Sequence, residues 1–238
     1  MPTTPSIADC AIVELRQYTL HPGQRDGLID LFSREFVENQ EVVGATIIGQ
    51  FRDLDDPDRY VWLRGFADME ARKAMLEAFY FGPVWQAHRE AANATIIDSD
   101  NVLLLKPLTP GAAFPLKDRP PVGAAEPGRG LIVAGVHALS GPDDPLPGRF
   151  EAELAPRLAE AGLTPITTLT TEHAANTFPR LPVREGETVL VWFAVCESRA
   201  AADAALAHAR AEPRLAALFD RPLQVLRLEP TARSRLQG

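Results

Sequence analysis

The alternation of hydrophobic and polar positions predicts four strands and two helices in the first half of the chain. Strands alternate with a period of two, whereas helices repeat their apolar positions at intervals of three and four. The strands are predicted at residues 11–20, 43–52, 60–67 and 100–107, and the helices at residues 24–38 and from about residue 69. Gly82 and Pro83 are expected to interrupt the second helix before Trp85. The predicted order is therefore strand, helix, strand, strand, helix, strand.

The second half of the chain repeats this order. Strands are predicted at 131–139, 163–170, 189–196 and 223–230, and helices at 146–161 and 200–218. Landmark residues keep their order when the halves are aligned: Leu20 with Leu139, Gly44 with Gly162, 66–68 with 195–197, Pro83 with Pro213, and Pro107 with Pro230. The difference in residue number between matched positions varies for two reasons. The loop at 171–187 is longer than that at 53–58, and the second half lacks a counterpart of 88–99. Six elements in the same order indicate a tandem repeat.

A segment rich in proline and glycine separates the two repeats. Residues 108–129 contain five prolines and three glycines, without the periodicity of a helix or strand. We therefore predict a first domain at 10–108, a linker at 109–128 and a second, divergent domain at 129–232.

The repeated order of elements is that of the ferredoxin-like fold, a four-stranded antiparallel sheet in the order 4-1-3-2 with helices on one face. The other sheet face would expose hydrophobic side chains unless it packed against a second sheet. The predicted fold class is therefore α+β, with two tandem ferredoxin-like domains packed sheet to sheet as an intramolecular α+β barrel with pseudo-twofold symmetry.

Composition and charge exclude several classes of protein. The chain is 46% hydrophobic and 24% charged, which is typical of a folded soluble protein, and its net charge of -8 argues against nucleic acid as a partner. It has no apolar run of about 20 residues and no signal-like start, so we expect a cytoplasmic protein without a membrane partner. The two cysteines and five histidines show no metal-binding spacing, and no nucleotide-binding or acyl-enzyme motif occurs, so neither a metal nor a cofactor is expected.

Candidate chemistry lies on one face of the first sheet. Residues two apart on a strand project from the same face. This rule groups Glu14, Arg16 and Tyr18 on the first strand, Gln50 and Arg52 on the second, and Tyr60, Trp62, Arg64 and Phe66 on the third. The sequence leaves open whether this face points into the barrel or lies beneath the helices. Buried arginines need compensating charge, which a carboxylate or phenolate ligand on Arg16 or Arg64 would supply.

The segment ELRQYTLHPG at residues 14–23 resembles the opening E-L-R-x-Y-x-L-x-P-G of the NIPSNAP family, within the dimeric α+β barrel superfamily. Residues 79–89, FYFGPVWQAHR, resemble the second-helix signature of that family, and residues 99–107 resemble its closing strand. The resemblance covers about residues 11–108, and the second half is similar to the superfamily pattern only. It implies the barrel fold. The biochemical role of the family is poorly defined, and the wider superfamily includes cofactor-free monooxygenases, lactone isomerases and haem-binding enzymes.

These observations support the hypothesis that the chain is a small-molecule-binding protein. A more specific hypothesis is a cofactor-independent isomerase or monooxygenase that acts on a small anionic or aromatic compound in the first domain. The candidate catalytic residues are Tyr18 and His88, and the candidate substrate-binding residues are Glu14, Arg16, Gln50, Arg52, Trp62, Arg64, Trp85 and His137. The matched positions of the second half, taken as Val133, Gly135, Val191 and Phe193, are apolar or lack a side chain. This asymmetry favours a site in the first domain.

Three alternatives stay open at this point. Glu14 and Arg16 could form a purely structural ion-pair network in a non-catalytic binding or scaffold protein. Haem could bind through His88 or His137. The loop at 171–187 could cover a pocket, form an unconstrained insertion or contact a second subunit of a homodimer.

Overall fold

The computed structural model describes residues 10–220 and 222–238, and its elements follow the predicted order. The strands of the first half are β1 (Ile12–Leu20), β2 (Thr46–Asp53), β3 (Arg59–Phe66) and β4 (Ile96–Pro107). Its first helical segment comprises α1 (Arg25–Leu31), the π-helical turn η2 (Phe32–Phe36) and α2 (Val37–Val42). Its second comprises α3 (Met69–Tyr80) and α4 (Pro83–Asn93), which are separated at Gly82 as predicted.

The second half has the same arrangement. Its strands are β5 (Leu131–Ala138), β6 (Pro165–Thr171), β7 (Val189–Cys196) and β8 (Gln224–Pro230). Its helical elements are α5 (Leu146–Arg149), η3 (Phe150–Leu154), α6 (Ala155–Glu160), α7 (Arg199–Ala211) and α8 (Ala216–Asp220). The π-helical turns η2 and η3 occupy corresponding places in the two halves, which supports the repeat.

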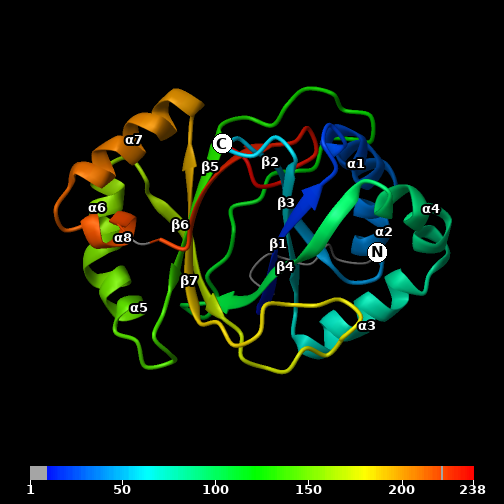
Figure 1. The fold of residues 1–238 in the computed structure, drawn as a ribbon, viewed down its shortest axis with the longest axis horizontal. Coiled ribbons are helices and arrows are strands. Elements are labelled where there is room, and N and C mark those ends of the chain that lie inside the picture. The colour runs from blue at the N-terminus through cyan, green and yellow to red at the C-terminus, as the bar shows by residue number, and fades with distance from the viewer. Residues whose placement is uncertain (1–9, 221) are drawn as a thin grey trace.

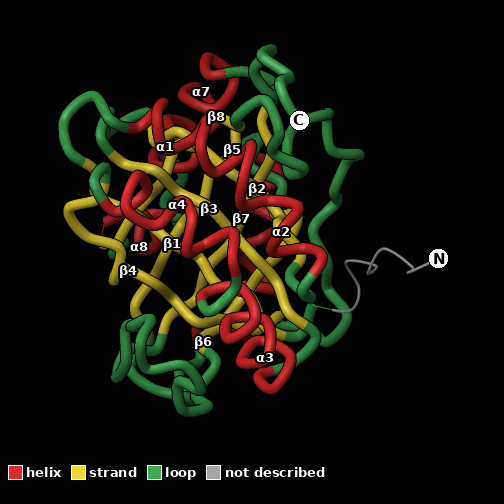
Figure 2. Tube along the Cα trace, turned by 90° about the vertical axis from the view of Figure 1, so that its right-hand side faces the viewer, coloured by secondary structure: helices red, strands yellow, loops and turns green. Residues whose placement is uncertain are grey.

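The eight strands close into one antiparallel barrel in the order β1-β3-β2-β8-β5-β7-β6-β4. Each half contributes its strands in the predicted order 4-1-3-2, and the two sheets join where β2 pairs with β8 and β4 with β6. The helices of the two halves cover opposite outer sides of the barrel, as Figure 1 shows, and Figure 2 shows the strands crossing between them. The predicted intramolecular α+β barrel is confirmed.

Side chains fill the interior of the barrel. Val13 and Leu15 of β1 belong to the same buried cluster as Ile132 and Ala134 of β5. Phe114 of the linker and Leu236 of the C-terminal tail complete this cluster. Gln17 and Gln224 exchange two amide hydrogen bonds of 2.8 Å. The interior is therefore a packed core.

The strand register corrects one part of the repeat alignment. Arg16 pairs with Trp62 across β1 and β3, and Gly135 pairs with Trp192 across β5 and β7. The side chains of Asp68 and Ser198 cap helices α3 and α7 in the same way, by accepting a hydrogen bond from the backbone N–H three residues later. Trp192 is therefore the counterpart of Trp62. The alignment predicted from the sequence, which matched Trp62 with Val191, is wrong by one residue in this strand.

Two predicted element boundaries are also corrected. The helix predicted at 200–218 ends at Ala211, because Glu212 precedes Pro213 and takes an extended conformation (φ -80°, ψ 116°). The strand predicted from residue 43 begins at Thr46, because Gly44, with a φ of 110°, ends the preceding helix. Gly162 plays the same part in the second half, with a φ of 94°.

The C-terminal tail after β8 belongs to the folded structure, although the predicted second domain ended at residue 232. Ser234 and Leu236 are fully buried, and the Leu236 N–H donates a 2.9 Å hydrogen bond to the Ile48 carbonyl. The tail thereby extends the contact between the two halves.

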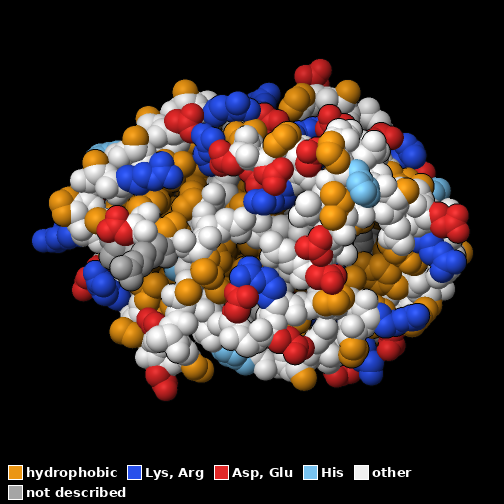
Figure 3. Space-filling model, viewed as in Figure 1, with side chains coloured by type: hydrophobic (Ala, Val, Ile, Leu, Met, Phe, Trp, Pro, Cys, Tyr) orange, Lys and Arg blue, Asp and Glu red, His pale blue; other side chains and the backbone are white. Residues whose placement is uncertain are grey.

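Acidic and basic side chains are interspersed over the face seen in Figure 3, with hydrophobic side chains in smaller patches between them. Among the described residues, none of the helices combines the length and apolar character needed to cross a bilayer.

Candidate functional site

The polar face of the first sheet lies beneath the helices and not inside the barrel. Tyr18, Tyr60 and Trp62 pack in one cluster with Phe32 and Phe36 of the first helical segment. Glu14, Arg16 and Arg64 lie on the same face and are fully buried. The orientation that the sequence left open is thereby settled, and any ligand of these residues must enter between the sheet and the helices.

The Glu14 carboxylate is the centre of a buried ion cluster. Its Oε2 accepts hydrogen bonds from Arg16 Nη1 at 2.9 Å and from Arg64 Nε at 2.7 Å. Its Oε1 accepts a hydrogen bond of 2.6 Å from Arg72 Nε of α3. Arg64 Nη1 donates to Gln40 Oε1 at 2.8 Å. The cluster thus ties the sheet to both helical segments of the first half.

The cluster contains more positive charge than negative charge. Three buried arginines face one buried carboxylate, which leaves a formal surplus of two positive charges. Arg16, Arg64 and Arg72 each have a buried Nη2 with no hydrogen-bond acceptor among the described residues, and the neighbouring Trp62 Nε1 has none either. All four atoms are donors. Unpaired buried donors are costly, so the cluster suits an anionic ligand rich in acceptor oxygens.

The pKa values of the cluster follow from this imbalance. Burial alone would raise the pKa of Glu14, but the charges of Arg64, Arg16 and Arg72 outweigh burial and hold that pKa well below its ordinary value. Burial lowers the pKa of Arg72, and the single charge of Glu14 offsets this only in part. Glu14 is therefore ionised at neutral pH, and it cannot neutralise all three arginines.

Tyr18 connects the cluster to an open pocket. Arg16 Nε donates a 3.3 Å hydrogen bond to the Tyr18 hydroxyl oxygen, and Tyr18 lies in the wall of a pocket of about 300 Å³. The pocket is lined by Tyr18, Tyr80, Phe81, Trp85, Gln86, Arg89, Asn93, Ile96, Ser99, Phe178, Arg180 and Leu181. Five of these residues are aromatic and two are arginines, and none carries a carboxylate. Such a lining suits a small aromatic anion.

Two of the pocket aromatics have defined roles. Burial raises the pKa of Tyr80, so its hydroxyl stays a neutral hydrogen-bond donor at neutral pH. The ring of Trp85 lies 4.9 Å from that of Tyr80 and 5.5 Å from that of Phe36. Trp85 therefore joins the pocket wall to the core beneath the helices.

The loop between β6 and β7 covers one side of the pocket. It crosses from the second half to the first, where it lies beside α3 (Figure 1), and Thr177 Oγ1 donates a 3.3 Å hydrogen bond to the Met69 carbonyl. The ring of Phe178 stacks on that of Tyr80 with centroids 5.8 Å apart. Of the three roles left open for this loop, the geometry favours that of a cover over the first-half pocket.

Of the ten predicted site residues, Tyr18 and Trp85 line this pocket, four belong to the ion cluster or adjoin it, and the remaining four lie away from both. Gln50 is buried beside Tyr60, whose hydroxyl donates to Gln50 Oε1 at 3.1 Å. Arg52 lies near the surface and pairs with Asp26 at 2.8 Å. His88 is half-buried with its Nε2 3.5 Å from Glu35 Oε2, and it does not line the pocket. The sequence analysis placed Arg52 on the same sheet face as Arg16 and Arg64. In the structure the third arginine of the ion cluster is Arg72, and Arg52 pairs with Asp26 instead.

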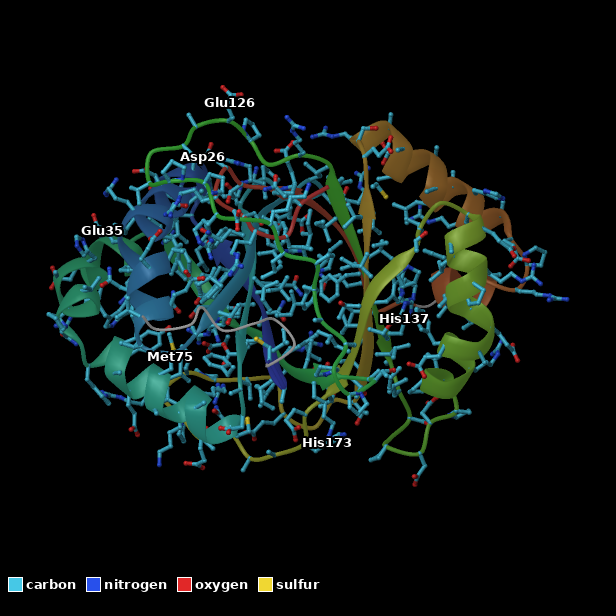
Figure 4. The ribbon with its side chains drawn as sticks, turned by 180° about the vertical axis from the view of Figure 1, so that it is seen from behind. Asp26, Glu35, Met75, Glu126, His137 and His173 are labelled. Atoms are coloured by element: carbon cyan, nitrogen blue, oxygen red, sulfur yellow. The ribbon has the colours of Figure 1, made fainter. Side chains whose placement is uncertain are left out.

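His137, the fourth, belongs to the second half. Figure 4 shows it on the opposite side of the molecule from Met75 of α3. Its Nε2 accepts a 2.9 Å hydrogen bond from Trp192 Nε1, and burial lowers its pKa to about 4, so the imidazole is neutral at pH 7. His137 is therefore a buried, hydrogen-bonded side chain of the second half. Because neither His137 nor His88 lines the pocket, no observation favours the haem hypothesis.

The second half fills the place of the cluster with an indole ring. A Cβ added at Gly135, the counterpart of Arg16, would lie 2.4 Å from the Trp192 ring. Val133 takes the place of Glu14, and Ala194 takes that of Arg64. The two halves therefore share a fold, but the described residues of the second half form no such ion cluster.

Gly135→Ala is expected to destabilise the protein by about 1–3 kcal/mol, because the new methyl group must displace the buried Trp192 ring. Urea unfolding measures the effect. Gly148→Ala is the control, since a Cβ there meets nothing within 4 Å. Equal stability of the two variants would contradict the packing described here.

Arg72 and Gln40 were missed by the sequence analysis. Arg72 lies on the same helical stripe as Met75, Leu76 and Phe79, and Gln40 lies on that of Phe36 and Val37. A charged or amide side chain on an apolar stripe was the available signal. It becomes informative only once the stripe is known to face Glu14 and Arg64.

The fold and the site define a tandem α+β barrel protein whose first half carries a small-molecule pocket beneath its helices. The family model of NIPSNAP proteins matches residues 13–110, so the first half of the chain is similar to a NIPSNAP domain. A NIPSNAP family protein of known structure from Agrobacterium tumefaciens is 24% identical, over 40% of this chain and 84% of that chain, with a TM-score of 0.38.

Two solved structures are similar over nearly the whole chain. A candidate monooxygenase from Lactobacillus acidophilus is 13% identical over 95% of this chain and 99% of its own, with a TM-score of 0.52. Another candidate monooxygenase, from Fusobacterium nucleatum, is 10% identical over 95% and 94%, with a TM-score of 0.55. These two similarities concern the fold of both halves together. No curated protein matches the chain significantly.

Proposed function

We propose that the protein binds a small aromatic anion in the first-half pocket and catalyses a proton transfer on it through Tyr18. The observation that carries this proposal is the surplus of buried positive charge behind Tyr18, with four N–H donors that lack an acceptor in the described part of the chain. A carboxylate or phenolate in the pocket would meet aromatic walls and a positive potential.

The contacts of the Tyr18 hydroxyl support a chemical role as well as a role in binding. Its oxygen accepts the Arg16 hydrogen bond, so its own proton is free to be donated towards the pocket. Negative charge that develops on this oxygen, or on a ligand atom bonded to it, would be stabilised by the buried Arg16. Tyr18 can therefore act as a general acid, and as a general base once it has lost its proton.

Native mass spectrometry of the freshly purified protein is the first test. We expect a bound small acid at one copy per chain, or one-to-one binding of members of a panel of benzoates and hydroxybenzoates in calorimetry. A chain that carries no adduct and binds none of the panel at millimolar concentration would overturn the proposal.

Tyr18→Phe separates catalysis from binding. We expect turnover of the identified ligand to fall by a factor of about 100 or more, with affinity changed less than about threefold, because only the hydroxyl is removed. Tyr60→Phe is the matched control, since Tyr60 is buried outside the pocket and donates to Gln50. Binding without turnover in the wild-type protein would instead identify a non-catalytic binding protein.

A further inference from the structure

The loop between β6 and β7 brings a second set of residues to the pocket. This loop belongs to the second half, but Phe178, Arg180 and Leu181 line the first-half pocket. Phe178 is buried, whereas Arg180 is exposed. The pocket is therefore assembled from both halves of the chain.

Asn176 fixes the shape of this segment and ties it to the ion cluster. Its Nδ2 donates a 3.0 Å hydrogen bond to the Leu181 carbonyl, and its Oδ1 accepts one of 3.1 Å from the Phe178 N–H. The same Oδ1 accepts a 3.1 Å hydrogen bond from Arg72 Nη1. One side chain thus closes the turn at 176–181 and anchors it to the buried arginines.

Arg180 is a cation that has no carboxylate partner among residues 10–220 and 222–238. Its guanidinium lies 5.3 Å from the centre of the Phe81 ring, and no ion pair joins it to any described residue. Arg89, on α4, lines the same pocket and also lacks an ion pair within the described part of the chain. Most other arginines near the surface pair with Asp or Glu, as Arg184 of the same loop does with Glu187. An unpaired arginine held over an aromatic ring is pre-organised to receive a carboxylate.

We propose that Arg180 determines the specificity of the first-half pocket for anionic ligands, and that Asn176 is the residue that positions it. This inference rests on the proposed function, since it concerns the ligand of the same pocket. The aromatic walls hold the ring of the ligand, the cluster behind Tyr18 attracts its charge, and Arg180 selects for a carboxylate at the rim. The second half therefore supplies selectivity to a site whose charged centre lies in the first.

Benzoate and benzamide test this role, because they have similar shapes and differ in charge. The wild-type protein is expected to prefer benzoate, and Arg180→Ala should weaken benzoate binding about tenfold while benzamide binding stays within about twofold. Arg180→Lys should restore part of the preference. Arg184→Ala is the matched control, since Arg184 lies in the same loop but pairs with Glu187 and does not line this pocket. Arg184→Ala should leave the ratio of benzoate affinity to benzamide affinity unchanged.

Asn176→Ala tests the positioning. We expect it to lower the benzoate preference as Arg180→Ala does, and we expect the double variant to have the same ratio as Arg180→Ala alone, because Asn176 acts through Arg180. If Asn176 has a merely structural role, Asn176→Ala should weaken the binding of both compounds equally, or its effect should add to that of Arg180→Ala.

The outcomes separate the two proposals. A wild-type protein that binds neither compound nor any other small acid overturns the proposed function and this inference together. A wild-type protein that prefers benzoate, with an unchanged preference in Arg180→Ala, overturns this inference and leaves the proposed function standing.

Discussion

Glu14→Gln is expected to destabilise the protein by about 3–5 kcal/mol, and Glu14→Ala is expected to prevent folding. Glutamine nearly keeps the volume of the side chain but removes the negative charge that pairs with three buried arginines. Removing one partner of a buried ion pair costs more than the pair contributes, because the remaining charge is left in a medium that solvates it poorly. Urea unfolding followed by circular dichroism measures the loss. Glu35→Gln is the control, because Glu35 is only partly buried and pairs with Arg34 at 2.8 Å.

The same residue predicts how stability depends on pH. The pKa of Glu14 in the folded protein lies well below its ordinary value of 4.5. The stabilisation that comes from its ionised form is therefore complete above the unfolded pKa, and it is lost as the pH falls from about 4.5 towards the folded pKa. The wild-type protein should lose more stability than Glu14→Gln over this acid range. Parallel pH profiles of the two proteins would contradict the cluster as described.

The fold could be predicted from the sequence because its signals are local and are repeated. Apolar residues such as Leu15, Val61 and Leu63 recur with strand period on one face, and the glycines at 44 and 162 end equivalent helices in the two halves. The repeat doubles this information. It also implies the packing of sheet on sheet, since each half alone would expose an apolar sheet face.

The orientation of the polar face could not be predicted, because both faces of β1 are buried. Leu15 and Arg16 are neighbours in sequence, and both are fully buried. The alternation of polar and apolar residues usually distinguishes the buried face of a sheet from its solvent-exposed face. Here one face packs inside the barrel and the other packs beneath the helices, so both are buried. Strand period placed Glu14, Arg16 and Tyr18 together, yet helix packing decides which interior they face.

The rest of the candidate site depends on contacts between distant parts of the chain. Arg72 meets Glu14 across 58 positions, and it meets Asn176 across 104. The loop that contains Asn176 has no periodic pattern, so its path follows from individual hydrogen bonds. His88 illustrates the converse case. It does lie near Phe36, as Trp85 does, but its imidazole contacts Glu35 and does not line the pocket.

Arg16→Met is expected to weaken the binding of aromatic carboxylates roughly ten- to a hundredfold without loss of stability. Methionine replaces the buried stem of the side chain, and the substitution reduces the positive surplus of the cluster from two charges to one. Glu14 keeps Arg64 and Arg72 as partners, so Arg16→Met does not leave the buried carboxylate without a counter-ion, as removal of one member of a simple pair would. The ligand, by contrast, loses the attraction of a buried cation behind Tyr18, and each tenfold loss of affinity corresponds to about 1.4 kcal/mol of that attraction.

Calorimetry with benzoate and urea unfolding of the same preparation measure both quantities for Arg16→Met. Arg52→Met is the matched control, because Arg52 pairs with Asp26 outside the pocket and should leave benzoate affinity unchanged. If Arg16→Met unfolds, the arginine surplus serves the structure, and the alternative of a structural ion-pair network becomes the better explanation. If it stays folded and loses the ligand, the protein keeps two uncompensated buried charges for binding, because a fold selected for stability alone would gain by losing one of them.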